Sequence, residues 1–595
     1  MNFDYGIVRP NRFPESRFPH PFFYNHQDSE AIKYSEEWNI IYISQLIREK
    51  PEWKRKSKQI SIVANWKSEI ESQFRDKTDY FEDIWDYVMK ELEWYIGVER
   101  NFPGLEKNGF TIGCDDKVVF SDTVVSSKTK EKLATCVNNF VEHEFKDTGP
   151  EYHPGSNDQV VDIVHPSLYP LQYGVTPYNA TRNEKGMSII QFDESVGKCK
   201  YGPDIWAQSE SFSWLPALMS LSKDSWNSTT YHFQSYINNL HPKYEDLYHV
   251  IEDVFNAAVP GLNFVLSRYK TKAFNRIPIS ESSYYTEEWE KMTEDYWEKE
   301  EQENISNDEY ETFHAQRVNY LKPLSINYEV DPPVDYTFDI RDTFGYLKVI
   351  VKLANIELTP EKPFYAGGTW HIEGTINEDI VATILYYYNC NNITESRLTF
   401  RSSFEDPDYD QGDTIALDKL FGLKDGDIMN RIVGDIKCQE DRLLVFPNGF
   451  QHKVESFGLE DKTRAGHRKI LCMFLVDPYN DKVVTSAQVP PQQYSWYEQD
   501  RIDEPIREQY LKEKAELDVN NEFFNPPDKW DMLQFFGSKW RQEVDELKNE
   551  GGRVSWPMSL DEAREIRKKL MDERKVPEDP EDGLAFTREF ALCEH

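Results

Sequence analysis

Cysteine is scarce in this chain, and its few copies lie far apart. Seven cysteines occur among 595 residues, and no two have the CxxC spacing of a zinc knuckle or a redox dithiol. Their scatter also disfavours the disulfide framework on which small secreted domains depend. The sequence therefore indicates a reduced intracellular protein, and we expect it in the cytoplasm, with the nucleus as the alternative.

Long apolar runs are missing as well. The mean hydropathy is −0.71, and no uncharged apolar stretch approaches the roughly 20 residues that a membrane-spanning helix needs. The N-terminal segment MNFDYGIVRPNRFPESRFPHPFF lacks the apolar centre of a secretory signal. We therefore expect neither a membrane nor a secreted setting.

Positive charge is low relative to negative charge. The chain has 68 basic and 105 acidic residues, which gives a net charge of −37. Because phosphate binding needs a basic surface, we expect no nucleic-acid partner. A P-loop, a dinucleotide-binding glycine fingerprint and a Gly-x-Ser-x-Gly elbow are also absent from the sequence. Nucleotide-dependent and serine-hydrolase functions therefore have no support.

Aromatic residues, by contrast, are abundant at 14% and spread along the whole chain, as in a large packed core. Hydrophobic spacing predicts a helical N-terminal region over 1–110 and a mixed α/β region over 111–345. The second region contains a strongly acidic insertion near 281–311, which we interpret as a solvated helix. Charged, helix-forming segments predict a helical C-terminal region over 481–595.

The remaining region, 346–480, has a different texture, because short apolar runs alternate there with turn residues. The runs cover 347–353, 380–388, 397–400, 443–446, 452–455 and 470–476. Their length and their β-branched and aromatic content predict antiparallel strands. This rhythm is typical of an antiparallel sandwich or barrel. The overall expectation is an α+β fold with a β core between helical regions.

Two short segments of this β region carry residues that bind metals. His371 and Glu373 are two positions apart, so on a strand they share one face, with Trp370 and Ile372 packed on the other. His452 follows on a later predicted strand, where we expect it to face the pair across a cavity. Two histidines and one carboxylate are the ligand set of a non-haem iron site with open positions.

A possible anion anchor follows in the last predicted strand. Arg468 comes two residues after Gly466, and its planar guanidinium can bind a carboxylate through two parallel hydrogen bonds. Three consecutive tyrosines, 386–388, lie on the strand after the His-x-Glu pair. Side chains alternate along a strand, so at least one phenol is expected to point into the site.

These motifs together resemble the double-stranded β-helix, or jelly roll, of the iron(II)- and 2-oxoglutarate-dependent oxygenases, particularly the prolyl-hydroxylase-like group. The resemblance rests on the His-x-Glu pair, the tyrosine-bearing strand, the distal histidine and the Gly-x-Arg sequence. It implies that His371, Glu373 and His452 hold Fe(II). It further implies that Arg468 anchors the cosubstrate 2-oxoglutarate, with Tyr387 as its tyrosine partner, and that 346–480 is the catalytic core.

The sequence departs from the pattern of that group in two places. Glu373 stands where aspartate is commoner, and its longer arm needs a wider pocket. The spacing from His452 to Arg468 is also longer than usual, which makes Lys462 and Arg464 rivals for the anchor role. Arg468 is preferred because a glycine two positions before it and a strand directly after it match the family arrangement.

A second resemblance covers most of the chain. Five segments are similar to those of a large fungal family of unknown function: Tyr152–Asn157, His165–Tyr169, Ser235–Pro242, Gly368–Gly374 and Gly466–Leu471. That similarity indicates membership of the family and implies no substrate.

The function implied is that of an Fe(II)- and 2-oxoglutarate-dependent dioxygenase that hydroxylates, or oxidatively demethylates, an unidentified substrate. A basic protein or peptide suits the net charge by electrostatic steering, and a small metabolite fits as well. Two alternatives stay open. One is a non-catalytic, barrel-based binding or scaffold protein, and the other is a cupin-like metalloenzyme that does not use 2-oxoglutarate.

Other polar residues receive a structural interpretation. The spacing of His143, His153 and His165 fits no regular ligand pattern, and His165 precedes a proline, as in a turn. Asn238 and Asn239 are interpreted as residues that cap a turn rather than as part of an active-site mouth.

Overall fold

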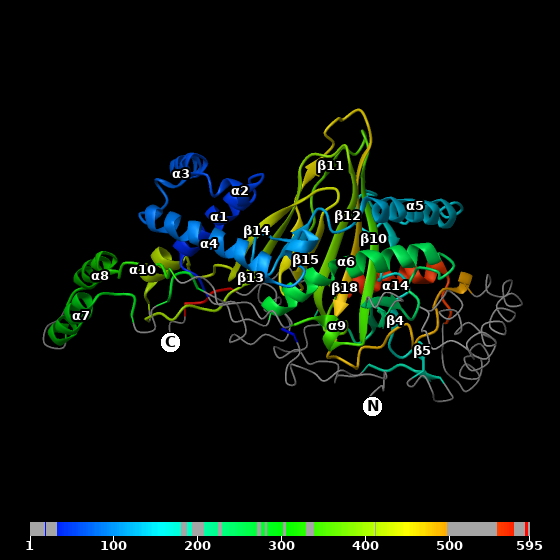
Figure 1. Ribbon diagram of the computed structural model, residues 1–595. Coiled ribbons are helices and arrows are strands. Elements are labelled where there is room, and N and C mark those ends of the chain that lie inside the picture. Colours follow the sequence, from blue (N-terminus) through cyan, green and yellow to red (C-terminus); the bar gives the residue numbers. More distant parts are fainter. Residues whose placement is uncertain are drawn as a thin grey trace, which may run out of the picture.

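The computed structural model describes most of the chain. It covers residues 18–19, 32–179, 187–192, 207–223, 229–269, 275–279, 283–300, 305–328, 338–410, 412–496, 556–575 and 589–592. Within these ranges the fold is mixed α/β, with antiparallel sheets flanked by helices (Figure 1). The described strands form no closed barrel. None of the described helices is long and apolar enough to cross a membrane.

The largest element is a nine-stranded antiparallel sheet whose centre is buried on both faces. Its strands, in spatial order, are β1 (Thr111–Ile112), β2 (Val119–Ser121), β15 (Leu443–Pro447), β12 (Ile380–Asn391), β18 (Gly466–Val476), β10 (Tyr346–Leu358), β8 (Ala217–Lys223) and β9 (Thr229–Phe233), with β3 (Val160–Val164) also paired to β10. The central strands read as nearly continuous apolar runs. Burial on both faces explains this, because neither face then needs polar residues.

One face of the large sheet is covered by helices. α6 (Glu245–Tyr269) contacts β9, β12 and β15, and α5 (Ser127–Glu144) contacts α6 and β12 (Figure 1). In α6 the apolar side chains of Val250, Val254, Ala258 and Leu262 recur at helical spacing and are fully buried. This stripe is what lets the helix lie flat on the sheet.

A second antiparallel sheet lies against the first. It consists of β14 (Asn430–Cys438), β13 (Ser396–Ser403) and β16 (Gln451–Val454), in that order. Smaller pairs join β11 (Phe364–Tyr365) to β17 (Phe457–Gly458), β4 (Leu171–Gln172) to β7 (Phe212–Ser213), and β5 (Pro177–Tyr178) to β6 (Ser188–Ile189). The strand β14 was not among the predicted runs. Its residue Ile432 is 60% exposed and Gly434 interrupts the apolar pattern, so its periodicity is weak.

Further helices lie outside the two sheets. The N-terminal ones are α1 (Ser35–Arg48), α2 (Trp53–Lys56), α3 (Ile60–Phe74) and α4 (Phe81–Asn101), and the short ones are η1 (Glu106–Asn108), η3 (Gln316–Tyr320), α9 (Ile340–Thr343), α10 (Thr414–Ala416) and η4 (Leu417–Phe421). The N-terminal helices cluster at one end of the molecule (Figure 1). In α4 the buried residues Ile84, Val88, Leu92 and Tyr95 recur every three or four positions, as in an amphipathic helix.

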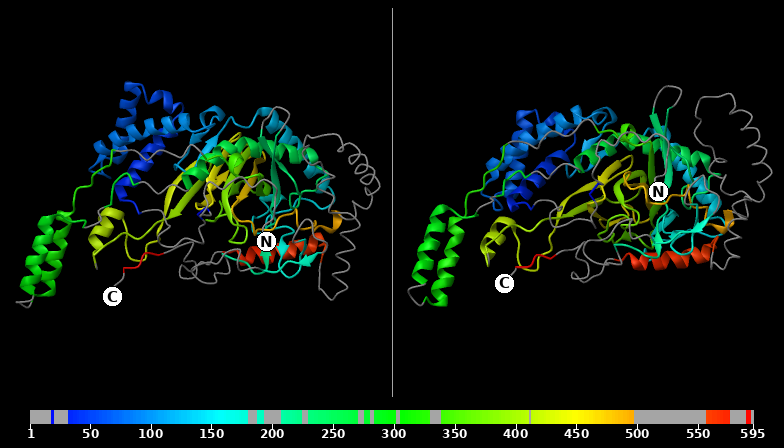
Figure 2. Two further views of the ribbon diagram at one scale, coloured as in Figure 1. Left: turned by 60° about the horizontal axis from the view of Figure 1, so that its bottom comes forward. Right: turned by 90° about the horizontal axis from the view of Figure 1, so that it is seen from below.

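The acidic insertion forms two helices rather than the single one expected. These are α7 (Glu287–Glu300) and α8 (Asn307–Ala315), which stand out from the sheets in both views of Figure 2. Stacked aromatic rings hold them together: the centroid of Phe313 lies 4.9 Å from that of Trp289 and 4.0 Å from that of Tyr296. The aromatic residues within the acidic sequence therefore provide a local core.

The C-terminal helix α14 (Leu560–Glu573) is fastened to the β3 region by buried charges. It begins with a capping box between Ser559 and Glu562. Arg567 then donates to Glu151 Oε1 at 2.5 Å and to Asp162 Oδ2 at 3.4 Å. Beyond them Leu570 is fully buried. These contacts hold the end of α14 in place as one wall of the pocket described below.

The docking of α14 can be tested by removing its buried charge. Arg567→Ala should lower the free energy of unfolding by about 1.5–3 kcal/mol, because it removes the buried cation shared by Glu151 and Asp162. Arg564 and His153 then remain as the partners of the two carboxylates. Urea unfolding measures this loss. Arg564→Ala is the matched control: Arg564 also pairs with Glu151 but is one-third exposed, so its loss should cost about 1 kcal/mol or less. Equal losses in the two variants would contradict the argument.

Candidate metal centre

The two predicted histidine ligands are paired through their backbones. His371 N–H donates to the carbonyl of His452 at 3.1 Å, and His452 N–H donates to the carbonyl of His371 at 2.9 Å. Their ring centroids lie 4.4 Å apart. The expectation that they face each other across a cavity is therefore wrong. His371 instead extends the second sheet beside β16, so adjacent positions of one sheet bring the imidazoles together.

Glu373 lies in a turn rather than on a strand. Its N–H donates to Asn448 Oδ1 at 2.9 Å, and Asn448 Nδ2 donates to the Glu373 carbonyl at 2.8 Å and to the Ile380 carbonyl at 3.0 Å. The turn then needs Gly374, whose φ is +71° and where a Cβ would meet Ile380 at 2.8 Å. Asn448 is fully buried. It thus fixes the backbone of the carboxylate residue, a role that the sequence analysis did not assign.

Because the chain leaves strand geometry here, Trp370 and Ile372 do not share one face. Ile372 is buried but lines the pocket, and the half-buried ring of Trp370 lies under the cations of Arg401 and Lys453, at 4.6 and 5.0 Å. The predicted packing of both residues on one opposite face is therefore wrong. Strict alternation of side chains ends where the chain leaves the sheet after His371.

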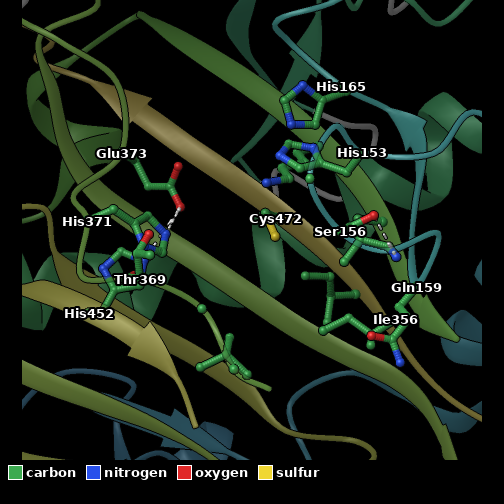
Figure 3. Close-up of a pocket in the computed structure, with 18 of the residues that line it drawn as sticks. His153, Ser156, Gln159, His165, Ile356, Thr369, His371, Glu373, His452 and Cys472 are labelled. Carbon is green, nitrogen blue, oxygen red and sulfur yellow. Dashed lines mark hydrogen bonds and ion pairs between the residues drawn. The ribbon is translucent and has the colours of Figure 1, made fainter. Parts of the chain in front are cut away.

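The three side chains converge on one point. The Nε2 atoms of His371 and His452 lie 3.7 and 3.5 Å from Glu373 Oε1 (Figure 3). The Nδ1 atom of His371 is 2.8 Å from the Thr369 carbonyl, and that of His452 is 3.4 Å from the Phe450 carbonyl. A carbonyl only accepts, so each Nδ1 carries the hydrogen and each Nε2 offers a lone pair. Two lone pairs and a carboxylate oxygen then meet with no donor between them, and a cation at that point satisfies all three.

The electrostatics of the cluster favour the metal-binding forms of these groups. Burial alone raises the pKa of Glu373, but the neighbouring His371 and His452 and the charge of Lys352 outweigh it and hold that pKa well below its usual value. Burial, with the charge of His371, lowers the pKa of His452. An ionised carboxylate and a neutral imidazole are the protonation states that bind a divalent metal.

The cluster opens into a pocket of about 760 Å³. Its floor is formed by β10, β18 and β12, where alternate residues of each strand line the pocket. The floor consists of Lys352, Ala354 and Ile356 on β10, Arg468, Ile470 and Cys472 on β18, and Leu385 and Tyr387 on β12. Figure 3 shows His371, Glu373 and His452 on one side of this pocket and His153 and His165 on the other.

Arg468 is a buried cation without a counter-anion. It is 2% exposed and lines the pocket. Its Nη1 donates to Ser396 Oγ at 2.7 Å, its Nε has no partner, and no carboxylate of the described residues forms an ion pair with it. Its guanidinium lies 5.5 Å from the ring centroid of Tyr387 and 5.3 Å from that of Phe457. A buried charge normally needs a partner, so this arrangement suits an anion that enters the pocket.

Of the other residues predicted near the anchor, only Tyr387 contacts Arg468 among the described residues. Lys462 and Arg464 are exposed and do not line the pocket, and Arg464 pairs with Asp461 at 2.8 Å. Tyr387 does lie beside Arg468, but its hydroxyl accepts from Cys438 Sγ at 3.2 Å. The ring face of Tyr387, rather than its hydroxyl, is therefore what meets the guanidinium.

A second group of possible ligands lies across the pocket. His153 Nδ1 is 2.9 Å from Asp162 Oδ2, and His165 Nε2 is 4.0 Å from Asp162 Oδ1. His143 lies elsewhere, with its Nδ1 2.9 Å from the Tyr244 hydroxyl. Asp162 was not among the predicted site residues, and β3 places it beside His153 and His165.

The charges around this second group disfavour a metal. Arg567 already pairs with Asp162 at 3.4 Å. Burial alone raises the pKa of Asp162, but His165, His153 and the charge of Lys352 lower it to about 2. A divalent ion here would therefore meet two existing cations around one carboxylate. The structural interpretation of His153 and His165 fits these contacts. Asn238 likewise caps backbone, since its Nδ2 donates to two carbonyls in the 168–169 turn.

The chain belongs to the family described as a protein of unknown function, DUF4246, whose profile matches residues 82–500. The profile of the N-terminal domain of the same family matches residues 5–69. No curated protein matches the chain. The membership of a family without an assigned function agrees with the sequence motifs.

Several solved structures share short stretches with this chain. IDO from Bacillus thuringiensis is 16% identical over 23% of this chain and 48% of its own, with a TM-score of 0.15. A bsmA homolog from Methylobium petroleophilum PM1 is 10% identical over 22% and 42%, with a TM-score of 0.14. The Fe(II)/(alpha)ketoglutarate-dependent dioxygenase TqaL is 15% identical over 26% and 47%, with a TM-score of 0.15. Each match spans less than half of the other chain, and TM-scores this low carry no argument about function.

The ligand assignment predicts which substitutions abolish metal binding. If the triad binds a divalent metal, Glu373→Ala and His452→Ala should each reduce the bound metal from about one ion per chain to near zero, because two remaining ligands do not hold the ion against water. Metal content after anaerobic dialysis measures this. His165→Ala is the control, since it removes a buried histidine of the same pocket but not of the triad. Metal loss in His165→Ala with retention in Glu373→Ala would reverse the assignment.

The supporting role of Asn448 predicts a graded effect. Asn448→Ala keeps all three ligands but releases the backbone of Glu373, so Fe(II) affinity should fall by about 10–100-fold, as when other outer partners of metal ligands are lost. Calorimetric titration with Fe(II) under argon gives the affinity. Asn238→Ala removes another buried asparagine that bonds only to backbone carbonyls, and its metal affinity should equal that of the wild type.

Proposed function

We propose that the two antiparallel sheets are the halves of a jelly roll. In the large sheet the strands run β15-β12-β18-β10, and in the second sheet they run β14-β13-β16, followed by His371. In chain order the eight segments are β10, His371, β12, β13, β14, β15, β16 and β18. The first, third, sixth and eighth lie in the large sheet, and the other four lie in the second sheet. A ribbon of antiparallel strands wrapped into two sheets has this order.

The metal in the proposed site is Fe(II), held by His371, Glu373 and His452. The observation that carries this proposal is the convergence of three acceptor atoms in one pocket with an unpaired buried guanidinium. A set of two histidines and one carboxylate, with open positions, is the arrangement that non-haem iron oxygenases use. The buried imidazole and the ionised carboxylate need no proton loss before they bind the ion.

The proposed cosubstrate is 2-oxoglutarate. Arg468 would pair with its distal carboxylate, and the faces of Tyr387 and Phe457 would hold the guanidinium in position. When bound, iron and 2-oxoglutarate would activate dioxygen, the oxidant, for attack on a C–H bond of a second substrate, with 2-oxoglutarate oxidised to succinate and carbon dioxide. The apolar side chains of Leu385 and Ile470 line the floor of the pocket and would limit the entry of water. The protein is thus proposed to be an oxygenase that hydroxylates or demethylates its substrate.

Arg468 also separates this function from the two alternatives. A cupin-like metalloenzyme without 2-oxoglutarate needs no buried cation beside its metal, and a scaffold protein needs neither group. Keeping a guanidinium 2% exposed without a counter-anion is unfavourable. A bound dicarboxylate removes that penalty, which is why the oxygenase is favoured.

The proposal predicts a spectroscopic signal that depends on Arg468. Anaerobic titration of the Fe(II)-loaded protein with 2-oxoglutarate should produce a visible metal-to-ligand band. In Arg468→Met the apparent dissociation constant should rise about 10–100-fold, because a hydrogen-bonded charge pair is lost, while iron content stays the same.

The exposed Arg464 provides the matched control. Arg464→Met should leave the titration unchanged. If the wild-type protein binds iron but shows no band, the 2-oxoglutarate-free alternative replaces this proposal. If the band appears and Arg468→Met titrates like the wild type, the anchor lies elsewhere in the pocket.

A further inference from the structure

The pocket wall is positively charged even though the protein is strongly acidic. Three cationic side chains, Lys352, Arg468 and Arg574, line it, and among the described lining residues Glu373 is the only carboxylate. A metal bound to Glu373 uses that negative charge. What remains facing the pocket is positive, and a charge of this kind acts on a ligand at short range regardless of the net −37 of the chain.

Lys352 is the cation with no assigned partner. Its ammonium forms no hydrogen bond or ion pair with any residue in the described ranges. Burial alone lowers the pKa of Lys352, but the charge of Glu373 and, less strongly, that of Asp162 raise it above its usual value. Neither carboxylate is available to it, because Asp162 already pairs with Arg567 and Glu373 belongs to the metal cluster.

The sheet register separates Lys352 from the cosubstrate anchor. Lys352 pairs with Cys472 across β10 and β18, whereas Arg468 pairs with Ile356. The two cations are therefore four residues apart along the floor, or about 13 Å at 3.3 Å per residue. The residues between them on this face, Ala354 and Ile470, are apolar. Lys352 thus stands at a different end of the pocket from Arg468.

A second cation with unused donors borders the same pocket. Arg574, at the end of α14, donates from Nη2 to Glu378 at 2.6 Å, but its Nε and Nη1 are buried and have no partner among the described residues. Its guanidinium lies 4.7 Å from the ring centroid of Trp214, which also lines the pocket. An aromatic surface beside free cationic donors suits an organic acid with an apolar body.

We propose that the substrate of this pocket is a carboxylate-bearing small molecule whose anionic group pairs with Lys352, at the end of the pocket away from Arg468. This inference rests on the proposed function in one respect, namely that the metal and Arg468 are taken by iron and cosubstrate. Of the two substrate classes left open by the sequence, it favours the small metabolite over the basic peptide, because a basic peptide would place a further positive charge beside Lys352 and the metal. Lys352 acts here as a binding and specificity residue.

The test uses two probes that differ only in charge, 4-fluorobenzoate and 4-fluorobenzamide. Each is titrated into the full-length protein loaded with Zn(II) and saturated with 2-oxoglutarate, and binding is followed by the broadening of the ¹⁹F signal. The carboxylate should bind at least about tenfold more tightly than the amide, and Lys352→Met should remove that preference by weakening only the carboxylate. Zinc prevents turnover, so the readout is binding alone.

Two variants separate charge from fold. Lys352→Arg keeps the cation and should retain a preference for the carboxylate. Lys469→Met removes one positive charge from the same sheet, but from a side chain outside the pocket that lies 3.5 Å from Asn138 Oδ1, and it should bind both probes like the wild type. Equal binding of the two probes, no binding of the carboxylate, or an unchanged preference in Lys352→Met would overturn the inference.

The same variants distinguish this inference from the proposed function. In Lys352→Met the Fe(II) protein should still give the 2-oxoglutarate band with an apparent affinity within about twofold of the wild type, since its anchor is Arg468. A tenfold loss there would make Lys352 the cosubstrate anchor and overturn the substrate assignment while the oxygenase proposal stands. If instead no band forms in the wild type but carboxylate binding still depends on Lys352, the oxygenase proposal fails and the anion subsite stands.

Discussion

The site depends on one pair of backbone hydrogen bonds, those between His371 and His452. They bring two segments that are distant in the chain into adjacent positions of one sheet. Asn448 then attaches Glu373 to the same frame through three further hydrogen bonds. The result is a set of acceptor atoms that face one another, with Glu373 and His452 buried and His371 partly exposed. Such an arrangement is unfavourable by itself and becomes favourable with a cation, so backbone geometry prepares the site for a metal.

Two positively charged residues of the pocket also lack partners of opposite charge within the described residues. Arg468 and Lys352 are cations without counter-anions among the described residues, as the histidine–glutamate cluster is a set of acceptors without a donor. The two cations therefore suit anionic ligands that bind from outside the chain, and the acceptor cluster suits a metal ion. The acidic surface has little influence here, because charges beyond about 8 Å are screened in physiological salt whereas buried ones act strongly. Local charge therefore governs what the pocket accepts.

Several features were predictable because they depend on local pattern. The runs at 347–353, 380–388 and 470–476 became the central strands β10, β12 and β18, since burial on both faces leaves a continuous apolar sequence. The weakly patterned strand β14, half exposed and interrupted by a glycine, was missed for the converse reason. The predicted packing of Trp370 and Ile372 was wrong because the alternation of side chains was assumed to continue past the point where the chain leaves the sheet.

The sequence by itself determined the types of residue available for chemistry: a spaced His-x-Glu pair, a distal histidine after a Pro-Asn-Gly turn and an arginine opening the last strand. The spacing of His371 and Glu373 keeps the two side chains close in space, although Glu373 lies beyond the end of the sheet and outside the strand period of two residues. Only the tertiary structure decided that the histidines are neighbours, that Asn448 holds Glu373, and that Lys352 stands apart from Arg468. Those relations arise from strand pairing between remote segments, and sheet register is set by the packing of the whole core.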